Sequence, residues 1–457
     1  MQSLPSIHIP ETIPPCDVCH KGEKAISPPT AVSLQDLTDS AKSGCAVCHL
    51  RYLAIQRDIP EEESDITLFF KFRGSLIHVE KTVWTGGRYR RLDGNSNFSL
   101  YTKNLSLLKT STSFIGIGRD VGHRESSHVP LITGWLKECH ENHHNCPTCT
   151  DVALPSRVLD VRGDVVRLIG VTPRQLGRYT ALSHCWGGGI EVRTTMQNYA
   201  AQKEGLRYCD LPLSFRDAII VTRGLGLRYL WIDALCIIQD SKIDWEVESG
   251  NMAAIYQHAF LVIGADTSSD SEGGFLDVQG GGYNGDRWPV ATVDNNVIYA
   301  RSEHRSNNNH QGAHTLDCEP LSARAWALQE QSLSSRMVHF ASKEMVWECK
   351  SALRCECMEL DREGHAPYPP LSLRTLTSSP NSFPAKFRDW YALVDQVTYR
   401  SLTKPEDLLP CLSGLVRYFQ DSGAGAYLAG LWREDLSSKR NVFQPEKIPW
   451  GLFRMVG

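Results

Sequence analysis

The sequence lacks the segments that carry a protein into or across a membrane. Its first twenty residues contain no basic start followed by an apolar stretch, which a secretory signal peptide requires. No apolar run approaches the roughly 18 residues that a membrane-spanning helix needs. We therefore expect a cytoplasmic protein with no membrane span.

The sequence also lacks an excess of charge of one sign. The formal net charge of −4 gives no overall field that would attract nucleic acid or an anionic membrane. The one local basic run, Arg88–Arg91, is explained by a solvated turn or strand face, because a nucleic-acid surface needs a longer basic stripe. We expect no nucleic-acid partner.

Composition divides the 457 residues into three parts, and a chain of this length is enough for two or three domains. Residues 1–150 form a Cys/His-rich N-terminal region, and residues 151–350 form an α/β core. Residues 351–457 form a linker and a mostly helical C-terminal region. The linker is placed at 363–384, where proline, serine and threonine are concentrated.

The fifteen cysteines of an intracellular chain should be mostly reduced, so we expect no disulfide framework. Pairs of cysteines separated by two residues can close a structural, tetrahedral zinc site. The competing interpretation is burial in an apolar core, where free cysteine is common. The favoured ligand set is Cys16, Cys19, Cys45 and Cys48, and the alternative set is Cys139, His143, Cys146 and Cys149.

Strands and helices alternate from residue 179 onward. Ser214 with Asp217, and Asp244, are expected to cap the two helices between the strands. The alternation predicts an α/β fold with a mainly parallel sheet flanked by helices, and two long loops follow at 268–286 and 304–316. Three apolar runs are typical of buried parallel strands: 179–183, 229–233 and 259–264.

The first of these strands ends abruptly in a glycine-rich loop. In an open α/β sheet, ligands bind where strands end in such loops. Glycines let backbone amides approach a phosphate closely, although a plain turn can have the same composition. The candidate binding residues here are Ser183, His184, Cys185, Trp186, Gly187 and Gly188, and Gly189 completes the loop.

His184 and Cys185 also raise the question of a cysteine nucleophile. Such a thiol needs a base within hydrogen-bond reach. Because neighbouring side chains in a strand point to opposite faces, His184 cannot easily activate Cys185 while both remain in the strand. Another histidine, such as His258 or His339, would have to do so. Otherwise the pair simply packs the end of the strand.

Asp233 ends the otherwise apolar run 229–233. A carboxylate in such a position is costly unless it is solvated, paired or used. We therefore regard Asp233 as a candidate contact for a polar ligand. A helix cap or a salt bridge to an arginine is the alternative.

Trp326 and Glu330 share one helix face because they are four residues apart, and Arg324, which with Trp326 is a candidate for substrate binding, lies beside them. An aromatic ring beside a carboxylate suits a nucleoside: the ring stacks, and the carboxylate stabilises the positive charge that develops when an N-glycosidic bond breaks. The alternative is an amphipathic helix with a buried tryptophan and an exposed glutamate.

Together these segments resemble the fungal heterokaryon-incompatibility (HET) domain family. Weaker family-like pieces outside the main blocks extend the likeness over most of the chain. Members are intracellular fungal proteins linked to non-self recognition between fused cells and to programmed cell death. Four blocks carry the resemblance: 179–188, 211–240, 244–265 and 324–349.

The HET family is in turn distantly similar to TIR domains, which implies a flavodoxin-like sheet. It also implies cleavage of NAD, as substrate, to nicotinamide and an ADP-ribose product, with Glu330 as the catalytic carboxylate. The match to the TIR pattern is partial, because Ala327 stands where that pattern has cysteine. His184 stands where tyrosine is common in the family, and the chain ends soon after Trp450, whereas many members continue.

The resemblance also implies self-association or an incompatibility partner protein, because TIR-like domains usually act as assemblies. Two other functions stay open at this point. One is a non-catalytic signalling or interaction module. The other is an unrelated small-molecule enzyme that reuses the HET fold with a cysteine, such as Cys185, or a histidine as its catalyst.

Overall fold

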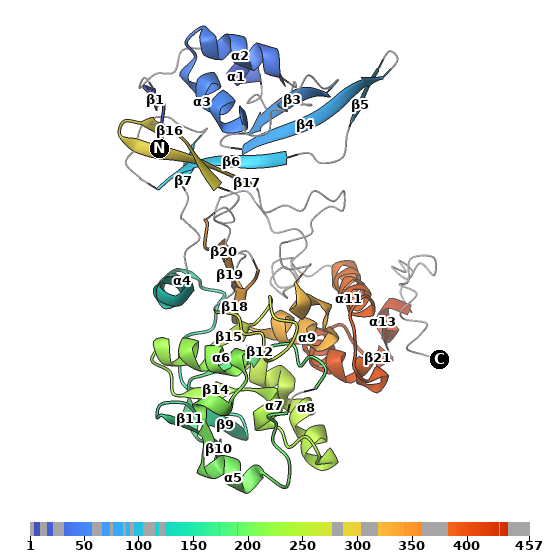
Figure 1. Ribbon diagram of the computed structural model, residues 1–457. Coiled ribbons are helices and arrows are strands. Elements are labelled where there is room, and N and C mark those ends of the chain that lie inside the picture. Colours follow the sequence, from blue (N-terminus) through green and yellow to red (C-terminus); the bar gives the residue numbers. More distant parts are fainter. Residues whose placement is uncertain are drawn as a thin grey trace. The chain divides into compact units, whose positions relative to one another are not determined.

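The computed structural model divides the chain into two compact units (Figure 1). The first comprises residues 1–121, 282–315 and 357–359, and the second comprises 122–281, 316–356 and 360–457. The boundary expected at residue 150 therefore lies inside the second unit. The structure describes residues 4–9, 16–21, 32–56, 66–73, 76–85, 88–91, 96–103, 115–117, 124–172, 174–189, 191–276, 287–302, 319–342, 344–358, 383–428 and 430–436.

Several predicted irregular segments lie outside these ranges. They are the loop at 304–316, the second half of the loop at 268–286, and the linker up to residue 382.

The first unit combines a mostly antiparallel sheet with short helices. Its strands follow the order β1-β16-β17-β6-β4-β3-β2, with β5 paired to β4 and β7 paired to β6. Helices α2 and α3 pack together and bury Leu37 and Leu50 in one apolar core with Val79 of the sheet. The bounds are β1 Ser6–Ile7, α1 Asp17–Lys21, β2 Val32–Ser33, α2 Leu34–Lys42, α3 Ala46–Ile55, β3 Ile66–Arg73, β4 Leu76–Thr85, β5 Arg88–Arg91, β6 Ser96–Thr102, β7 Gly116–Ile117, β16 Arg287–Val293 and β17 Asn296–Ser302.

The hairpin β16–β17 belongs to this first unit, whereas composition placed residues 287–302 in the α/β core. Strand β17 pairs with β6, and Ala300 lies opposite Leu100. Asp294 and Asn295 both have positive φ, as a two-residue type I′ hairpin turn requires. The local sequence indicates the turn between β16 and β17. It does not indicate that β17 pairs with β6, which lies far earlier in the chain.

The second unit is built on a nine-stranded sheet with the order β13-β10-β9-β14-β12-β15-β18-β19-β20. Only the pairs among the four central strands, β14, β12, β15 and β18, are parallel. The outer pairs are antiparallel, so the sheet is mixed and the prediction of a mainly parallel sheet is wrong. The reason is that short antiparallel strands extend both ends of the parallel centre.

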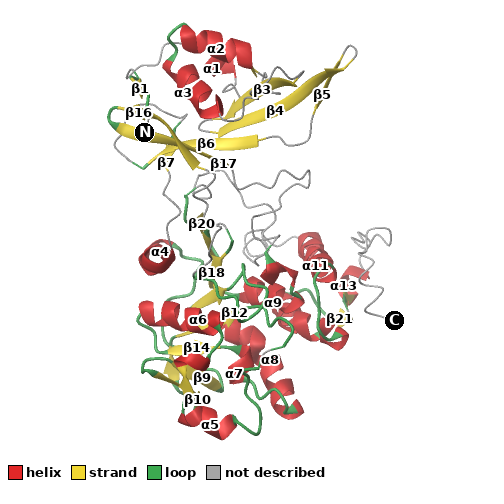
Figure 2. Cartoon of the chain, viewed as in Figure 1, coloured by secondary structure: helices red, strands yellow, loops and turns green. Residues whose placement is uncertain are grey.

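Helices surround this sheet, as Figure 2 shows. The helix bounds are α4 Arg124–Asn142, α5 Tyr199–Glu204, α6 Leu213–Gly224, α7 Asp233–Cys236, α8 Lys242–His258, α9 Ala325–Leu333, α11 Phe383–Thr398, α12 Ser413–Asp421 and α13 Arg433–Leu436, with 3-10 turns η3 Tyr208–Asp210, η6 Pro320–Ala323, η7 Pro405–Leu408 and η8 Pro410–Leu412. The strand bounds are β8 Val152–Ala153, β9 Arg157–Asp160, β10 Val165–Gly170, β11 Leu176–Gly177, β12 Tyr179–Ser183, β13 Leu206–Arg207, β14 Tyr229–Trp231, β15 Leu261–Gly264, β18 Arg336–Phe340, β19 Met345–Cys349, β20 Leu353–Cys355, β21 Tyr427–Leu428 and β22 Leu431–Trp432.

The order of the four parallel strands is one in which ligands commonly bind at a particular point of the sheet. Along the chain β12 comes first, then β14, β15 and β18, so their order across the sheet is second, first, third, fourth. This is the start of the doubly wound order 2-1-3-4-5, in which ligands bind at the switch point between the first and third strands. That point lies between β12 and β15, where Ser183 pairs with Gly264.

The helix starts differ from the sequence prediction. Helix α6 follows Pro212 without a side-chain cap, and Ser214 lies inside the helix. Asp217 instead accepts hydrogen bonds from the backbone N–H groups of Phe275 and Leu276, at 2.6 and 2.9 Å. Helix α8 is capped by Ser241 rather than by Asp244. In both cases a distant partner takes the carboxylate that local spacing assigned to a cap.

The C-terminal helices share a core with the helix that carries Glu330. Ala325 and Leu328 of α9 pack in one apolar cluster with Trp390 of α11 and Leu415 of α12. The predicted C-terminal helices therefore form part of the second unit. Within the described ranges, every helix is too short or too polar to cross a membrane.

Candidate functional site

Glu330 of α9 and Ser183 at the end of β12 are in direct contact, although 147 residues separate them in sequence. The Ser183 hydroxyl donates a hydrogen bond to Glu330 Oε2. Both residues are only 1% exposed. Tyr256 of α8 interacts with the same carboxylate, and its hydroxyl donates to the Leu182 carbonyl at 3.1 Å. The predicted carboxylate thus contacts the last residue of β12, at the edge of the sheet where the glycine-rich loop begins.

Asp233 and Trp186 lie at the same edge. The indole Nε1 of Trp186 donates to Asp233 Oδ2 at 2.8 Å, and the backbone N–H of Ala234 donates to Oδ1 at 2.7 Å. His184 Nδ1 is 3.8 Å from Asp233 Oδ1. Three candidates that follow two different strands, β12 and β14, are therefore held together, and Asp233 is paired as the cost of a buried carboxylate demands.

His184 is buried, and neither ring nitrogen has a hydrogen-bond partner among the described residues. Its ring packs edge-on against Phe215, with 5.2 Å between centroids. Burial lowers the pKa of His184 to about 4, against the opposing effect of Asp233, so the ring is neutral near pH 7. An unpaired imidazole of this kind can donate to or accept from a bound ligand.

Glu330 titrates close to neutral pH. Burial raises its pKa to about 7, while the positive charge of Arg324 and the Ser183 hydrogen bond oppose the shift. Arg324 is half-buried and has no carboxylate within ion-pair distance in the described part of the chain. The alternative of an exposed glutamate on an amphipathic helix is therefore wrong, because Glu330 is 1% exposed.

Trp326 contacts the C-terminal helical part. Its indole Nε1 donates to Asp407 Oδ2 at 3.3 Å, and its half-buried ring packs against two apolar clusters. Trp326 therefore has a packing role, as the amphipathic-helix alternative expected for this tryptophan.

The glycine-rich loop is exposed, and one of its glycines is sterically required. Gly187 has a φ of +71°, and a Cβ added there would lie 2.4 Å from the Cβ of Asp270. Gly188 and Gly189 face open space. Close packing against Asp270 thus explains Gly187, and only the next two glycines offer free backbone to a ligand.

The surroundings of Cys185 do not favour a nucleophile. Burial raises the pKa of its thiol to about 11. His339 lies between Asp266 and Glu348, at 3.1 and 3.5 Å. Burial opposes charge on His339, but these two carboxylates raise its pKa to about 10, so it is protonated and cannot act as a base. His258 lines a cavity with Arg178 and Phe260, which precede β12 and β15 and so mark the opposite edge of the sheet.

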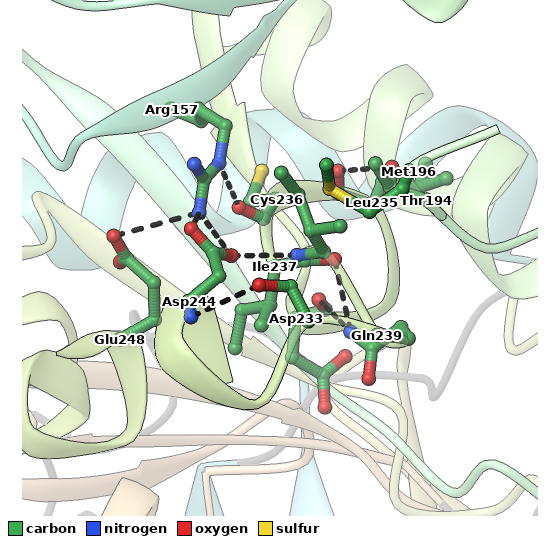
Figure 3. Close-up of polar contacts among 12 residues, drawn as sticks. Arg157, Thr194, Met196, Asp233, Leu235, Cys236, Ile237, Gln239, Asp244 and Glu248 are labelled. Atoms are coloured by element: carbon green, nitrogen blue, oxygen red, sulfur yellow. Dashed lines mark hydrogen bonds and ion pairs between the residues drawn. The ribbon is translucent and has the colours of Figure 1, made fainter. Parts of the chain in front are cut away.

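Arg157 of β9, which sequence analysis missed, holds the chain that follows Asp233 (Figure 3). Its guanidinium donates to both oxygens of Asp244, at 2.8 and 2.6 Å, and to the carbonyl of Cys236 at 2.6 Å. Glu248 lies 3.5 Å away. Because the partners of Arg157 lie far along the chain, the local sequence shows only an arginine in a strand of alternating apolar and polar residues.

Replacing Arg157 with methionine should destabilise the second unit by about 3 kcal/mol, because the buried Glu248 and the half-buried Asp244 would be left without their cation. Urea unfolding measures this. The matched control is Arg162→Met, whose exposed pair with Asp160 should contribute about 1 kcal/mol or less. Equal losses in the two variants would contradict the assignment.

The favoured cysteine set is brought together in the first unit. The four Sγ atoms of Cys16, Cys19, Cys45 and Cys48 lie within 4.8 Å of one another. Cys16 and Cys48 are 3.7 Å apart, and Cys19 and Cys45 are 3.9 Å apart. Thiolates bound tetrahedrally at zinc–sulfur distances of about 2.3 Å are separated by about 3.8 Å. The set has the geometry to hold a metal ion.

The second cluster differs from the predicted set in one member. Cys139, His143 and Cys146 meet Cys349 of β19. Cys149 instead lines the cavity that also contains Arg178. Cys349 lies some two hundred residues further along the chain, so no local spacing could have indicated it.

A comparison with known protein families assigns part of the chain to one of them. Residues 179–330 match the model of the heterokaryon incompatibility protein (HET) family. The match runs from the first residue of β12 to Glu330. It therefore contains β12, β14 and β15, and the residues described around Glu330 and Asp233, which are Ser183, His184, Trp186, Tyr256 and Arg324. No curated protein and no solved structure matched the chain. The chain therefore contains a domain of the heterokaryon-incompatibility (HET) family at residues 179–330.

Proposed function

We propose that this HET-domain protein cleaves the N-glycosidic bond of a nucleotide-type substrate, NAD. The observation that carries the proposal is the buried contact between Glu330 and Ser183 at the switch point of the sheet. The cellular role that we propose is the family's own, cytoplasmic non-self recognition that ends in programmed cell death. We also propose that the chain resembles TIR domains in this chemistry and that it acts as an assembly, either with further copies of itself or with an incompatibility partner protein.

In this reaction the bond between nicotinamide and the ribose C1′ breaks, and its electron pair leaves with nicotinamide. The ionised Glu330 carboxylate stabilises the oxocarbenium-like ribose. Water then adds to C1′ and releases a proton, which gives ADP-ribose. His184 and Asp233 supply polar contacts to hydroxyl groups, Gly188 and Gly189 supply backbone amides to phosphates, and Arg324 supplies positive charge.

Purified full-length chain incubated with NAD, as isolated and at concentrations that drive self-association, tests the proposal. We expect nicotinamide to be released, and no turnover in any oligomeric state would contradict it.

The pH dependence of turnover is a second expected result. Because ionised Glu330 is the active form, the rate should rise as pH increases through about 7. In Ser183→Ala the hydrogen bond that lowers the Glu330 pKa is lost, so the rise should move to higher pH. A profile of kcat from pH 5 to 9 measures both effects. An unchanged profile in Ser183→Ala would contradict the coupling of the two residues.

A non-catalytic signalling or interaction module is the second candidate, and the burial of Glu330 and His184 favours it. This module would bind NAD or a partner protein without releasing nicotinamide. The third candidate, an enzyme that uses Cys185, is disfavoured by the raised pKa of that thiol.

We further propose that Cys16, Cys19, Cys45 and Cys48 bind a structural zinc ion. Four thiolates leave no open position for water, so the ion would stabilise the first unit and take no part in catalysis.

A further inference from the structure

We infer that Cys139, His143, Cys146 and Cys349 form a second structural zinc site, which lies in the same unit as the HET domain. The ligand atoms of these residues all lie within 4.8 Å of one another. Three cysteines and one histidine are a ligand set that zinc prefers in structural sites.

The end of helix α4 places three of the four ligands. Cys139 lies in the last turn of α4, and the backbone N–H of His143 donates to its carbonyl at 3.3 Å. The N–H of Cys146 in turn donates to the carbonyl of His143 at 3.1 Å. These two tight bends bring three side chains to one side of the chain. Cys349, the last residue of β19, completes the set.

The histidine is oriented as a metal ligand would be. Its Nδ1 lies 3.2 Å from Cys349 Sγ, close to the separation of about 3.5 Å that a shared tetrahedral zinc ion imposes. Its other nitrogen, Nε2, lies 3.8 Å from the carboxylate of Glu138. A carboxylate behind the second ring nitrogen commonly fixes the tautomer of a zinc-bound histidine.

A buried arginine supplies the independent observation. Arg336 is 3% exposed, and its Nε donates to Cys139 Sγ at 3.3 Å. Its terminal nitrogen donates to the carbonyl of Pro147, and no carboxylate of the described chain lies within ion-pair distance. A buried cation is costly without a counter-charge. Three thiolates and one Zn²⁺ carry a net charge of −1, which is the partner that Arg336 otherwise lacks.

The site would close a long loop of the chain. Cys139 precedes the HET match at 179–330 and Cys349 follows it, while Arg336 and Cys349 lie opposite each other on β18 and β19. The zinc ion would therefore link α4, which precedes the matched segment, to β19, which follows it. The folded unit of the HET domain would thus be larger than the matched residues.

Metal content and zinc-edge X-ray absorption of the full-length chain test this inference. We expect two zinc ions per chain, with an average of about 3.5 sulfur and 0.5 nitrogen ligands per ion. In Cys48→Ser the remaining ion should show about three sulfurs and one nitrogen. In Cys349→Ser the remaining ion should show about four sulfurs, and Cys149→Ser, the matched control, should keep both ions.

A wild-type chain with a single zinc ion bound by four sulfurs would overturn the inference. So would two ions retained in Cys349→Ser, or a disulfide between Cys139 and Cys146 in the native chain. The wild-type spectrum needs no variant, so a substitution that prevents folding leaves the test intact. None of these results depends on NAD turnover.

Discussion

Replacing Glu330 with glutamine should reduce NAD cleavage by a factor on the order of 10³, because the amide cannot stabilise the positive ribose as a carboxylate does. Glutamine has nearly the same shape and keeps an acceptor oxygen for the Ser183 hydroxyl, so the fold should persist. Nicotinamide release under single-turnover conditions measures the effect. KM should change little, because the lost interaction forms only as the bond breaks.

The matched control is Glu319→Gln. Glu319 is also a buried glutamate, 6% exposed, but its carboxylate accepts hydrogen bonds from the backbone and side chain of Ser342. Its replacement should leave the rate of NAD cleavage unchanged. Equal losses in both variants would mean that the effect of Glu330→Gln comes from general destabilisation.

The same variant has a stability signature with a definite sign. In the wild type, protonated Glu330 is favoured in the folded state, whose pKa of about 7 exceeds the ordinary value of 4.5. The stability that protonated Glu330 contributes to the folded state is fully present below pH 4.5 and is lost as pH rises through about 7. Because glutamine mimics the protonated form, the variant should gain about 3 kcal/mol relative to wild type between pH 5 and 8. Urea unfolding at both pH values measures this, and a constant difference would contradict the shifted pKa.

Removing zinc from the cysteine set of the first unit should unfold that unit. Apparent binding energies of structural zinc are on the order of 10 kcal/mol, which is comparable with the whole stability of a small domain. In Cys48→Ser, or after treatment with a strong chelator, we expect residues 32–56 to lose hydrogen-exchange protection, since α2 and α3 pack beside the cluster.

Cys209→Ser is the control for this result, because Cys209 is exposed and belongs to none of the groups of the described residues that could hold a metal ion. It should keep its zinc and its exchange protection. Full protection of α2 and α3 after the metal has been removed would show that apolar packing alone holds this unit together.

Local patterns predicted the elements of the HET domain well but not how they assemble. The apolar runs at 179–183, 229–233 and 259–264 correspond to β12, β14 and β15, because buried strands need continuous apolar residues. Asp217 and Asp244 were assigned to helix caps, whereas their partners are the backbone of 275–276 and Arg157. Those partners are distant in sequence, so spacing alone could not find them.

In the candidate site too, the local sequence indicated individual residues but not their distant partners. The sequence singled out Asp233 because a carboxylate in an apolar segment needs a partner or a function. It singled out Glu330 because this residue lies one helical turn after Trp326 and matches the TIR pattern. It did not indicate Tyr256, Arg157 or Cys349, which reach their clusters only through the strand order of the sheet. Residue chemistry is thus readable locally, while the choice among chemically equivalent partners depends on the fold.

A crystal structure of Glu330→Gln soaked with NAD tests the central claim most directly, because the inactive variant should retain the uncleaved substrate. We predict that the nicotinamide ribose lies against the side chain at position 330, with its phosphates beside Gly188 and Gly189. NAD bound in the cavity at the opposite edge, beside Arg178 and Lys350, or no bound NAD at all, would contradict the account.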